Sequence, residues 1–421
     1  MLNKLKLKSE FSRNVLTLMT GTTIAQAIPI AISPILTRIY TPEEFGVFSL
    51  YISIISLLAM IATGRYEIAI VLPKKDSEAI DLMKLCVVIN LSLLVVILTL
   101  VLFFRSQISS LLNVGEISFW LYFVPISFFF MGIFQVFNYW NIRKNDFKIL
   151  SKNKIIQTSS NGLTSLSIGY SGLGINGLVL ANILAQIIAT SLLIKFFLKK
   201  HKKEMLVFNG VRMFALSKRY IKMPLLNMPN AFIDVLRTSG INILISNFFS
   251  TSILGFFSLA FRMVQMPMAL IGGALTQVLY SKMSKGEIKD LPRLLYKTII
   301  SCALIGFLPF CILYFYSVEI FSFVFGETWK VTGEIVVVLV PWLYLNFITM
   351  PISNVFIVLN KQEIMLYFSI IYTIVPLSIF SIYREIAFLE LLNIVSLSMT
   401  ALLICFVYLV IYTSKKENKI K

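Results

Sequence analysis

Long apolar stretches separated by short polar segments run along the whole chain. About 20 apolar residues in a helix cross the ~30 Å hydrocarbon core of a bilayer, so each long stretch is a predicted membrane span. The predicted spans lie near residues 15–37, 46–71, 84–104, 117–140, 154–170, 174–194, 221–246, 252–279, 298–318, 331–359, 364–383 and 386–412. The fifth of these is polar and rich in small residues, which favours close helix packing over lipid contact. The pattern predicts an all-α polytopic membrane protein with about twelve transmembrane helices.

Composition supports this fold class. Apolar residues make up 57% of the 421 residues and charged residues only 14%, which is more apolar side chain than a soluble fold can bury.

The positions of the basic residues indicate the orientation in the membrane. The N-terminus, segments 72–84, 141–154, 195–222, 280–297 and 361–363, and the C-terminus hold 31 of the 38 Lys and Arg residues. Because cytoplasmic loops are rich in Lys and Arg, both termini are predicted to be cytoplasmic. The net charge of +18 is thereby explained by topology and anionic lipid. It does not indicate nucleic acid, since the basic residues are dispersed over many loops.

The chain contains an internal repeat. Residues 38–85 align without a gap to residues 247–294, so that GVFSL at 46–50 falls on GFFSL at 255–259. The offset of 209 residues is half of the chain. We therefore predict an N-terminal six-helix lobe (1–200), a basic cytoplasmic linker on the membrane surface (201–220) and a C-terminal six-helix lobe (221–421). An even number of spans per lobe predicts parallel repeats around a central cleft, the architecture of a transporter.

Charged residues inside apolar spans are costly and therefore mark candidate substrate sites. Asp234 and Arg237 are three residues apart on one predicted helix face, where they either pair with each other or line the cleft. Arg262 has no acidic neighbour in its span, which favours the cleft. Gln265 and Gln277 on the same predicted helix are weaker candidates for a polar lining.

A second group of polar residues ends the predicted second span. Arg65, Tyr66 and Glu67 lie at its cytoplasmic end. They are either an interfacial anchor, with a snorkelling Arg and a Tyr at headgroup level, or a polar gate. Arg38 and Tyr40 at the end of the first span have the same two interpretations, with the anchor favoured.

The sequence offers no site for enzyme chemistry. The single histidine, His201, lies in a lysine run, and the four cysteines lie in apolar runs without CxxC spacing. There is no Gly-rich phosphate loop, and no paired carboxylates or Ser/His/Asp set occurs in an outer loop. We therefore expect a protein that is not an enzyme and has no cofactor or metal.

One stretch carries a family resemblance. RIYTPEEFGVFSLYISIISLLAMIATGRYEIAIVLPKKDSEAIDLMKL strongly resembles the start of bacterial polysaccharide-biosynthesis flippases. These are the O-antigen (Wzx-type) flippases of the multidrug/oligosaccharidyl-lipid/polysaccharide (MOP) exporter superfamily. The matching residues are Arg38, Tyr40, Pro42, Phe45, Gly46, Arg65, Tyr66, Glu67, Leu72, Pro73, Asp76 and Glu78, and FGETW at 325–329 also looks like the family.

The resemblance implies a substrate of undecaprenyl pyrophosphate bearing one oligosaccharide repeat unit. Such a flippase moves its substrate from the cytoplasmic to the periplasmic leaflet of the inner membrane by alternating access. Arg237 and Arg262 would bind the pyrophosphate, because guanidinium groups match phosphate oxygens, and Asp234 would restrain Arg237. Membrane lipids, a polysaccharide polymerase, a chain-length regulator and a coupling H+ or Na+ are the expected partners.

Four other classes compete with this interpretation. A lipid II-type flippase is the nearest alternative. A multidrug exporter of the same superfamily is disfavoured because the first span has no Asp or Glu, and a major-facilitator transporter because its loop 2–3 signature is missing. A polymerase is disfavoured because no large outer loop exists.

Overall fold

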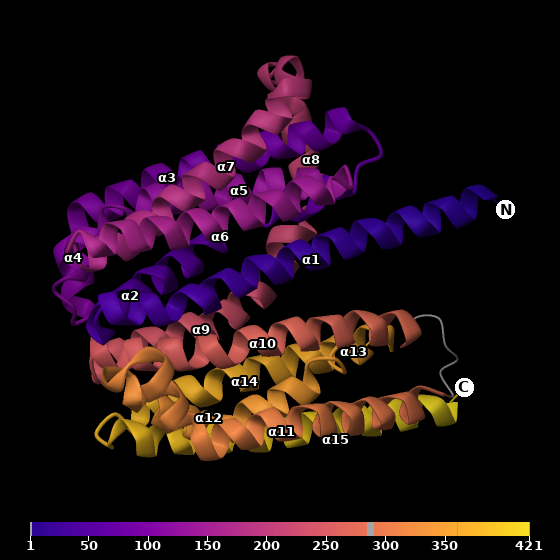
Figure 1. The fold of residues 1–421 in the computed structure, drawn as a ribbon. Helices are drawn as coiled ribbons and strands as arrows, with labels where there is room; N and C mark the ends of the chain where they lie inside the picture. Colours follow the sequence, from indigo (N-terminus) through magenta and orange to yellow (C-terminus); the bar gives the residue numbers. More distant parts are fainter. Residues whose placement is uncertain (1, 284–289, 360, 421) are drawn as a thin grey trace. The chain divides into compact units, whose positions relative to one another are not determined.

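The chain forms two compact helical units. A computed structural model describes residues 2–283, 290–359 and 361–420, and every regular element in these ranges is a helix. The units are Met1–Val235 and Leu236–Lys421, coloured from indigo to pink and from pink to yellow in Figure 1.

Six long helices build the first unit. They are α1 (Leu2–Ile39), α2 (Pro42–Ala59), α3 (Asp76–Leu111), α5 (Val124–Arg143), α6 (Phe147–Tyr170) and α7 (Ile175–Leu206). Shorter elements are η1 (Tyr66–Val71), α4 (Ile117–Leu121), α8 (Gly210–Arg219) and η2 (Met223–Asn227). Helix α6 packs between α1 and α7, and α5 packs on both α7 and α3.

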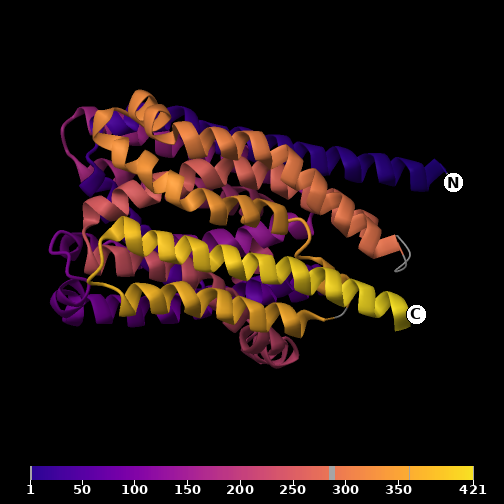
Figure 2. The same ribbon diagram turned by 90° about the horizontal axis from the view of Figure 1, so that it is seen from below.

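The second unit also contains six long helices. Helix α9 (Met228–Phe248) begins in the first unit and continues into the second. The others are α10 (Thr251–Met283), α11 (Leu291–Phe325), α12 (Lys330–Thr349), α14 (Gln362–Ile382) and α15 (Phe388–Ile420), with η4 (Glu327–Trp329) and α13 (Val355–Val358) as short elements. Helix α12 contacts α10, α11 and α15, and α15 runs beside α14 (Figure 2).

Two units of six long helices confirm the predicted fold class. Nine helices in the described ranges are long and apolar enough to span a membrane on their own. The polar fifth span is a helix, α6, and its small residues allow a close approach to α1. A Cβ at Gly162 would lie 2.4 Å from the Ile32 Cδ1 atom, so no larger side chain fits without displacing Ile32.

The predicted second span, 46–71, is not one helix. Helix α2 ends at Ala59, and Gly64 and Arg65 adopt left-handed φ angles of 58° and 62° before η1 begins. Polar side chains hold this break: Asn90 Nδ2 donates to the Ala62 carbonyl oxygen at 3.3 Å, and the Thr63 hydroxyl donates to the Glu67 carboxylate.

The predicted linker is largely helical. Helix α7 continues to Leu206 and is followed by the amphipathic helix α8, which buries Met213 and Leu216 while Val211 and Phe214 remain exposed. Because α8 packs on α3, it belongs to the first unit. The two units divide inside α9, between Val235 and Leu236.

Candidate substrate site

A pocket inside the second unit contains one of the predicted arginines. Four helices contribute to it. The lining residues are Arg237, Thr238, Ile241 and Asn242 from α9, Phe257, Phe261 and Gln265 from α10, Trp342 and Asn346 from α12, and Tyr372 from α14.

The aromatic wall of this pocket holds Arg237. The guanidinium carbon of Arg237 lies 4.6 Å from the centre of the Tyr372 ring, which is a cation–π contact. The indole Nε1 of Trp342 donates a 2.6 Å hydrogen bond to the Tyr372 hydroxyl, and both aromatic side chains are buried. Tyr372 is thereby fixed in position, and the cation is held against a rigid surface.

The pocket combines the groups that bind sugars and phosphates. Arg237 provides a permanent cation with a planar set of N–H donors. Amide groups of Asn242, Gln265 and Asn346 both donate and accept hydrogen bonds. The cavity is about 80 Å³, which accommodates one functional group of a large substrate rather than a whole oligosaccharide. This arrangement suits an anionic group such as a phosphate.

The other intramembrane candidates lie on α9 and α10, two of the four helices that line the pocket. Asp234 precedes Arg237 by one turn of α9 and is exposed, and Gln265 lines the pocket. Arg262 on α10 is partly buried beside Phe261 but is not part of the lining, and it has no acidic partner among the described residues. The side chain of Gln277 lies outside the described residues.

Of the predicted gate residues, Tyr66 and Glu67 are buried in the first unit and Arg65 is partly exposed. Glu67 is fully buried, and its Oε1 atom is 3.5 Å from Arg65 Nη1. Tyr66 is buried as well, and its hydroxyl donates a 3.1 Å hydrogen bond to the Ser217 carbonyl oxygen on α8. Tyr66 thereby joins the break after α2 to the amphipathic helix α8. Arg38 is exposed at the end of α1.

Sequence reasoning missed Trp342, Tyr372 and Asn346. Each lies in an apolar span, where an isolated aromatic or amide side chain is indistinguishable from ordinary helix packing. Only the close approach of α9, α12 and α14 gives these residues a common function. The tryptophan could have identified this site from the sequence, because a buried indole N–H requires a hydrogen-bond acceptor nearby.

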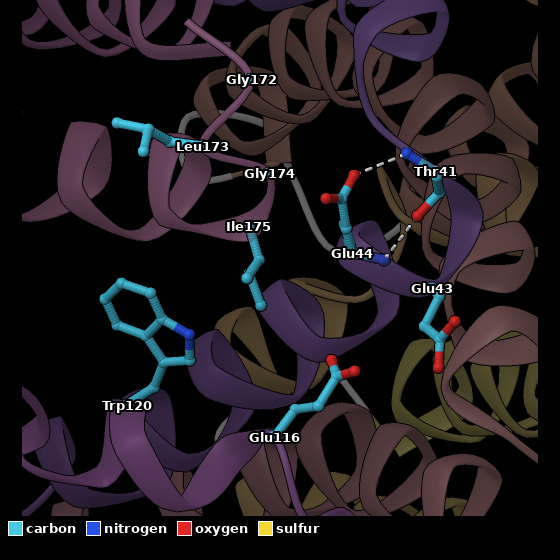
Figure 3. Close-up of a pocket in the computed structure, with 9 residues that line it drawn as sticks. All are labelled: Thr41, Glu43, Glu44, Glu116, Trp120, Gly172, Leu173, Gly174 and Ile175. Carbon is cyan, nitrogen blue, oxygen red and sulfur yellow. Dashed lines mark hydrogen bonds between the residues drawn. The ribbon is translucent and has the colours of Figure 1, made fainter.

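A second pocket, in the first unit, has the opposite electrostatic character. It is lined by Glu43, Glu44 and Glu116 together with Trp120 and the 172–175 loop (Figure 3). The Glu44 carboxylate accepts a 2.8 Å hydrogen bond from the Thr41 backbone N–H, and the Thr41 hydroxyl accepts one from Glu44 N. Glu44 thus caps α2 in a capping box. Three carboxylates disfavour an anionic ligand in this pocket, in contrast to the Arg237 pocket.

Known proteins resemble the chain in sequence and in fold. The sequence matches the family described as polysaccharide biosynthesis protein over residues 35–334. No curated protein matches it. The fold is similar to an inward-facing multidrug resistance MATE family transporter of the MOP superfamily, with a TM-score of 0.71, 15% identity and coverage of 96% of this chain and 94% of that one.

Two further solved structures are similar in fold. A MOP superfamily transporter from Pyrococcus furiosus, described as having a binding pocket of reversed polarity, has a TM-score of 0.65 at 16% identity and covers 96% of this chain and 95% of its own. A point mutant of the Vibrio cholerae MATE transporter VcmN has a TM-score of 0.62 at 14% identity, with coverage of 99% of both chains.

Proposed function

Because the chain belongs to the polysaccharide biosynthesis protein family and has the fold of MOP superfamily transporters, we propose that it is a flippase for lipid-linked sugars. Its substrate is undecaprenyl pyrophosphate carrying an oligosaccharide repeat unit of O-antigen or a related surface polysaccharide. The protein moves this substrate from the cytoplasmic to the periplasmic leaflet of the bacterial inner membrane by alternating access. Translocation breaks no covalent bond, so the protein is not an enzyme.

The Arg237 pocket is the observation that carries this proposal. A pyrophosphate is multiply anionic, and it needs a cation to compensate for lost hydration in a membrane protein. Arg237 stands over Tyr372, among amide groups suited to sugar hydroxyls. In this proposal the Arg237 guanidinium binds the pyrophosphate, and the amide groups of Asn242, Gln265 and Asn346 orient the adjoining sugar.

Further parts of the proposal concern coupling and partners. Arg65, Tyr66 and Glu67 restrict access on the cytoplasmic side, and Arg262 and Asp234 act with Arg237 during transit. Either exchange with a proton or sodium ion, or the downhill flux of the substrate itself, drives the movement. On the periplasmic side a polymerase with its chain-length regulator receives the repeat units.

The test compares surface polysaccharide and lipid-linked sugars in a strain lacking the gene. We expect the polysaccharide ladder to disappear and single lipid-linked repeat units to accumulate on the inner leaflet. Arg237→Ala should fail to restore the ladder, and Arg237→Lys should restore it in part, because lysine keeps the charge but not the planar donor set.

A matched control comes from the same unit. Arg384 also makes a cation–π contact, 5.8 Å from the centre of the Phe248 ring, but its side chain is 58% exposed outside the pocket, so Arg384→Ala should restore the ladder fully. An unchanged ladder in the deletion strain would contradict the proposal. Loss of cell-wall precursor transport would then indicate a lipid II-type flippase, and altered drug resistance a multidrug exporter.

A further inference from the structure

A third pocket lies at the predicted cytoplasmic end of the first unit. It is formed where α5 ends and the last turns of α7 pass beside it, and it has a volume of about 640 Å³. Its lining includes Trp140, Lys144, Phe196, Lys199, Lys200 and His201. All of these residues lie in or next to the basic segments 141–154 and 195–222, far in sequence from Arg237.

A local break in α7 gives this pocket its floor. His201 leaves helical geometry, with φ −123° and ψ 21°. The ring centre of His201 lies 5.1 Å from that of Trp140 and 5.3 Å from that of Phe197, and its Nδ1 atom is hydrogen-bonded to Glu204 Oε2 at 3.0 Å. Trp140 and Phe197 are buried. The floor is therefore a fixed aromatic cluster.

The charges around this floor are mostly positive. Lys144 lies 5.0 Å above the Trp140 ring and pairs with Asp76. Lys199 and Lys200 are exposed, and neither has an acidic partner within the described ranges. Asp146 is the one carboxylate in the lining. Two lysines without counter-charges over an aromatic floor form a binding site for an anion.

We propose that this pocket binds a phosphate group. The lysine ammonium groups bind the phosphate oxygens as point charges, and Trp140 and Phe196 contact the apolar or ring-shaped body that carries the phosphate. Phe196 is 51% exposed beside the lysines, so the site accepts an amphipathic ligand as well as a small one. The phosphate belongs either to an anionic phospholipid headgroup or to a soluble phosphate or pyrophosphate compound. The site is separate from the Arg237 pocket, which lies in the other unit.

Two lysine pairs on one helix allow a sharp test. The full-length protein is compared with the double variant Lys199→Gln/Lys200→Gln and with the control Lys202→Gln/Lys203→Gln. The control residues are exposed on the same helix but do not line the pocket, and both variants lose the same net charge. Binding of inorganic pyrophosphate is measured by calorimetry in phosphatidylcholine nanodiscs. Retention of phosphatidylglycerol over phosphatidylcholine is measured by native mass spectrometry.

The outcomes separate the two phosphate sources. We expect the pocket variant to lose affinity by at least ~10-fold, as befits charge-assisted contacts, while the control stays within ~2-fold of the wild type, as screened surface charges do. Loss confined to the phosphatidylglycerol arm assigns a lipid headgroup, and loss in the pyrophosphate arm assigns a soluble ligand. Equal weakening in both variants, or no binding of either probe by the wild type, would overturn the proposal.

Discussion

Asp81 on α3 and Arg212 on α8 form an ion pair in which Arg212 Nε lies 3.0 Å from Asp81 Oδ2. The other carboxylate oxygen of Asp81 accepts a 3.0 Å hydrogen bond from Lys84 Nζ, which also donates to the Val207 carbonyl oxygen at 2.5 Å. One carboxylate therefore connects α3 to the segment that leads out of α7 and into α8.

Removing the charge of Asp81 should destabilise the first unit. The Lys84 side chain is only 6% exposed, so Asp81→Asn leaves a buried ammonium without its counter-charge. We expect a loss of about 3 kcal/mol in unfolding free energy, at the low end for a broken buried pair, because Lys84 keeps its bond to Val207. Melting of the purified protein in detergent measures the effect.

Arg212→Gln is the matched control for this prediction. The Arg212 side chain is 39% exposed, and its removal leaves the Lys84–Asp81 pair intact, so the loss should stay below about 1 kcal/mol. Equal melting shifts in the two variants would show that the contact of α8 matters and that the buried pair does not.

Gly174→Ala should weaken the start of α2. Gly174 has a φ of 56°, and a Cβ at this position would lie 2.4 Å from Glu44 Oε1. The substitution thus adds backbone strain and displaces the carboxylate of the capping box. We expect a loss of about 2 kcal/mol from these two effects together. Gly172→Ala provides the comparison, since Gly172 also has a positive φ, of 72°, but a Cβ there meets nothing within 4 Å. A melting shift as large for Gly172→Ala would rule out the effect on Glu44.

Tyr372→Phe and Tyr372→Leu separate two contributions of one side chain. The phenylalanine variant keeps the ring beneath Arg237 but leaves the buried Trp342 Nε1–H without its acceptor, at a cost of roughly 1–3 kcal/mol. The leucine variant also removes the cation–π contact. We therefore expect lower melting temperatures for both variants, and loss of the surface-polysaccharide ladder for leucine only. A ladder lost equally in both would mean that the hydroxyl, not the ring, is needed.

The arrangement of long helices could be predicted from hydrophobicity and loop charge, because both act on whole segments. The break after α2 could not. Gly64 and Gly273 are equivalent in the internal repeat. Yet Gly64 has a left-handed backbone conformation, with a positive φ angle, whereas Gly273 lies within the continuous helix α10. The difference arises from residues that only the first half contains. Arg65 and Glu67 interact next to the break, where the second half has Ala274 and Thr276.

The candidate site was predictable only where a polar group marked it. Arg237 and Gln265 stand out in the sequence because polar side chains are energetically costly inside a membrane span. Both line one pocket. Trp342 and Tyr372 do not stand out in the sequence. Their role depends on the hydrogen bond between α12 and α14, which leaves no periodic pattern in the sequence. Helix α8 falls within the predicted linker, and its polar contact to α3 through Arg212 depends on tertiary structure alone.

The orientation predicted from the basic loops can be tested by cysteine labelling. On a background in which the four free cysteines are replaced by alanine, Lys330→Cys should react with a membrane-impermeant maleimide added to intact spheroplasts. Lys202→Cys should react only after the membrane is permeabilised. Both positions are exposed, so a failure to label reports the side of the membrane rather than burial. The Lys/Arg bias predicts that Lys202 lies on the cytoplasmic side. The reverse labelling pattern would show that the protein has the opposite orientation in the membrane. Labelling of both positions from one side would show that the predicted number of spans between them is wrong by an odd number.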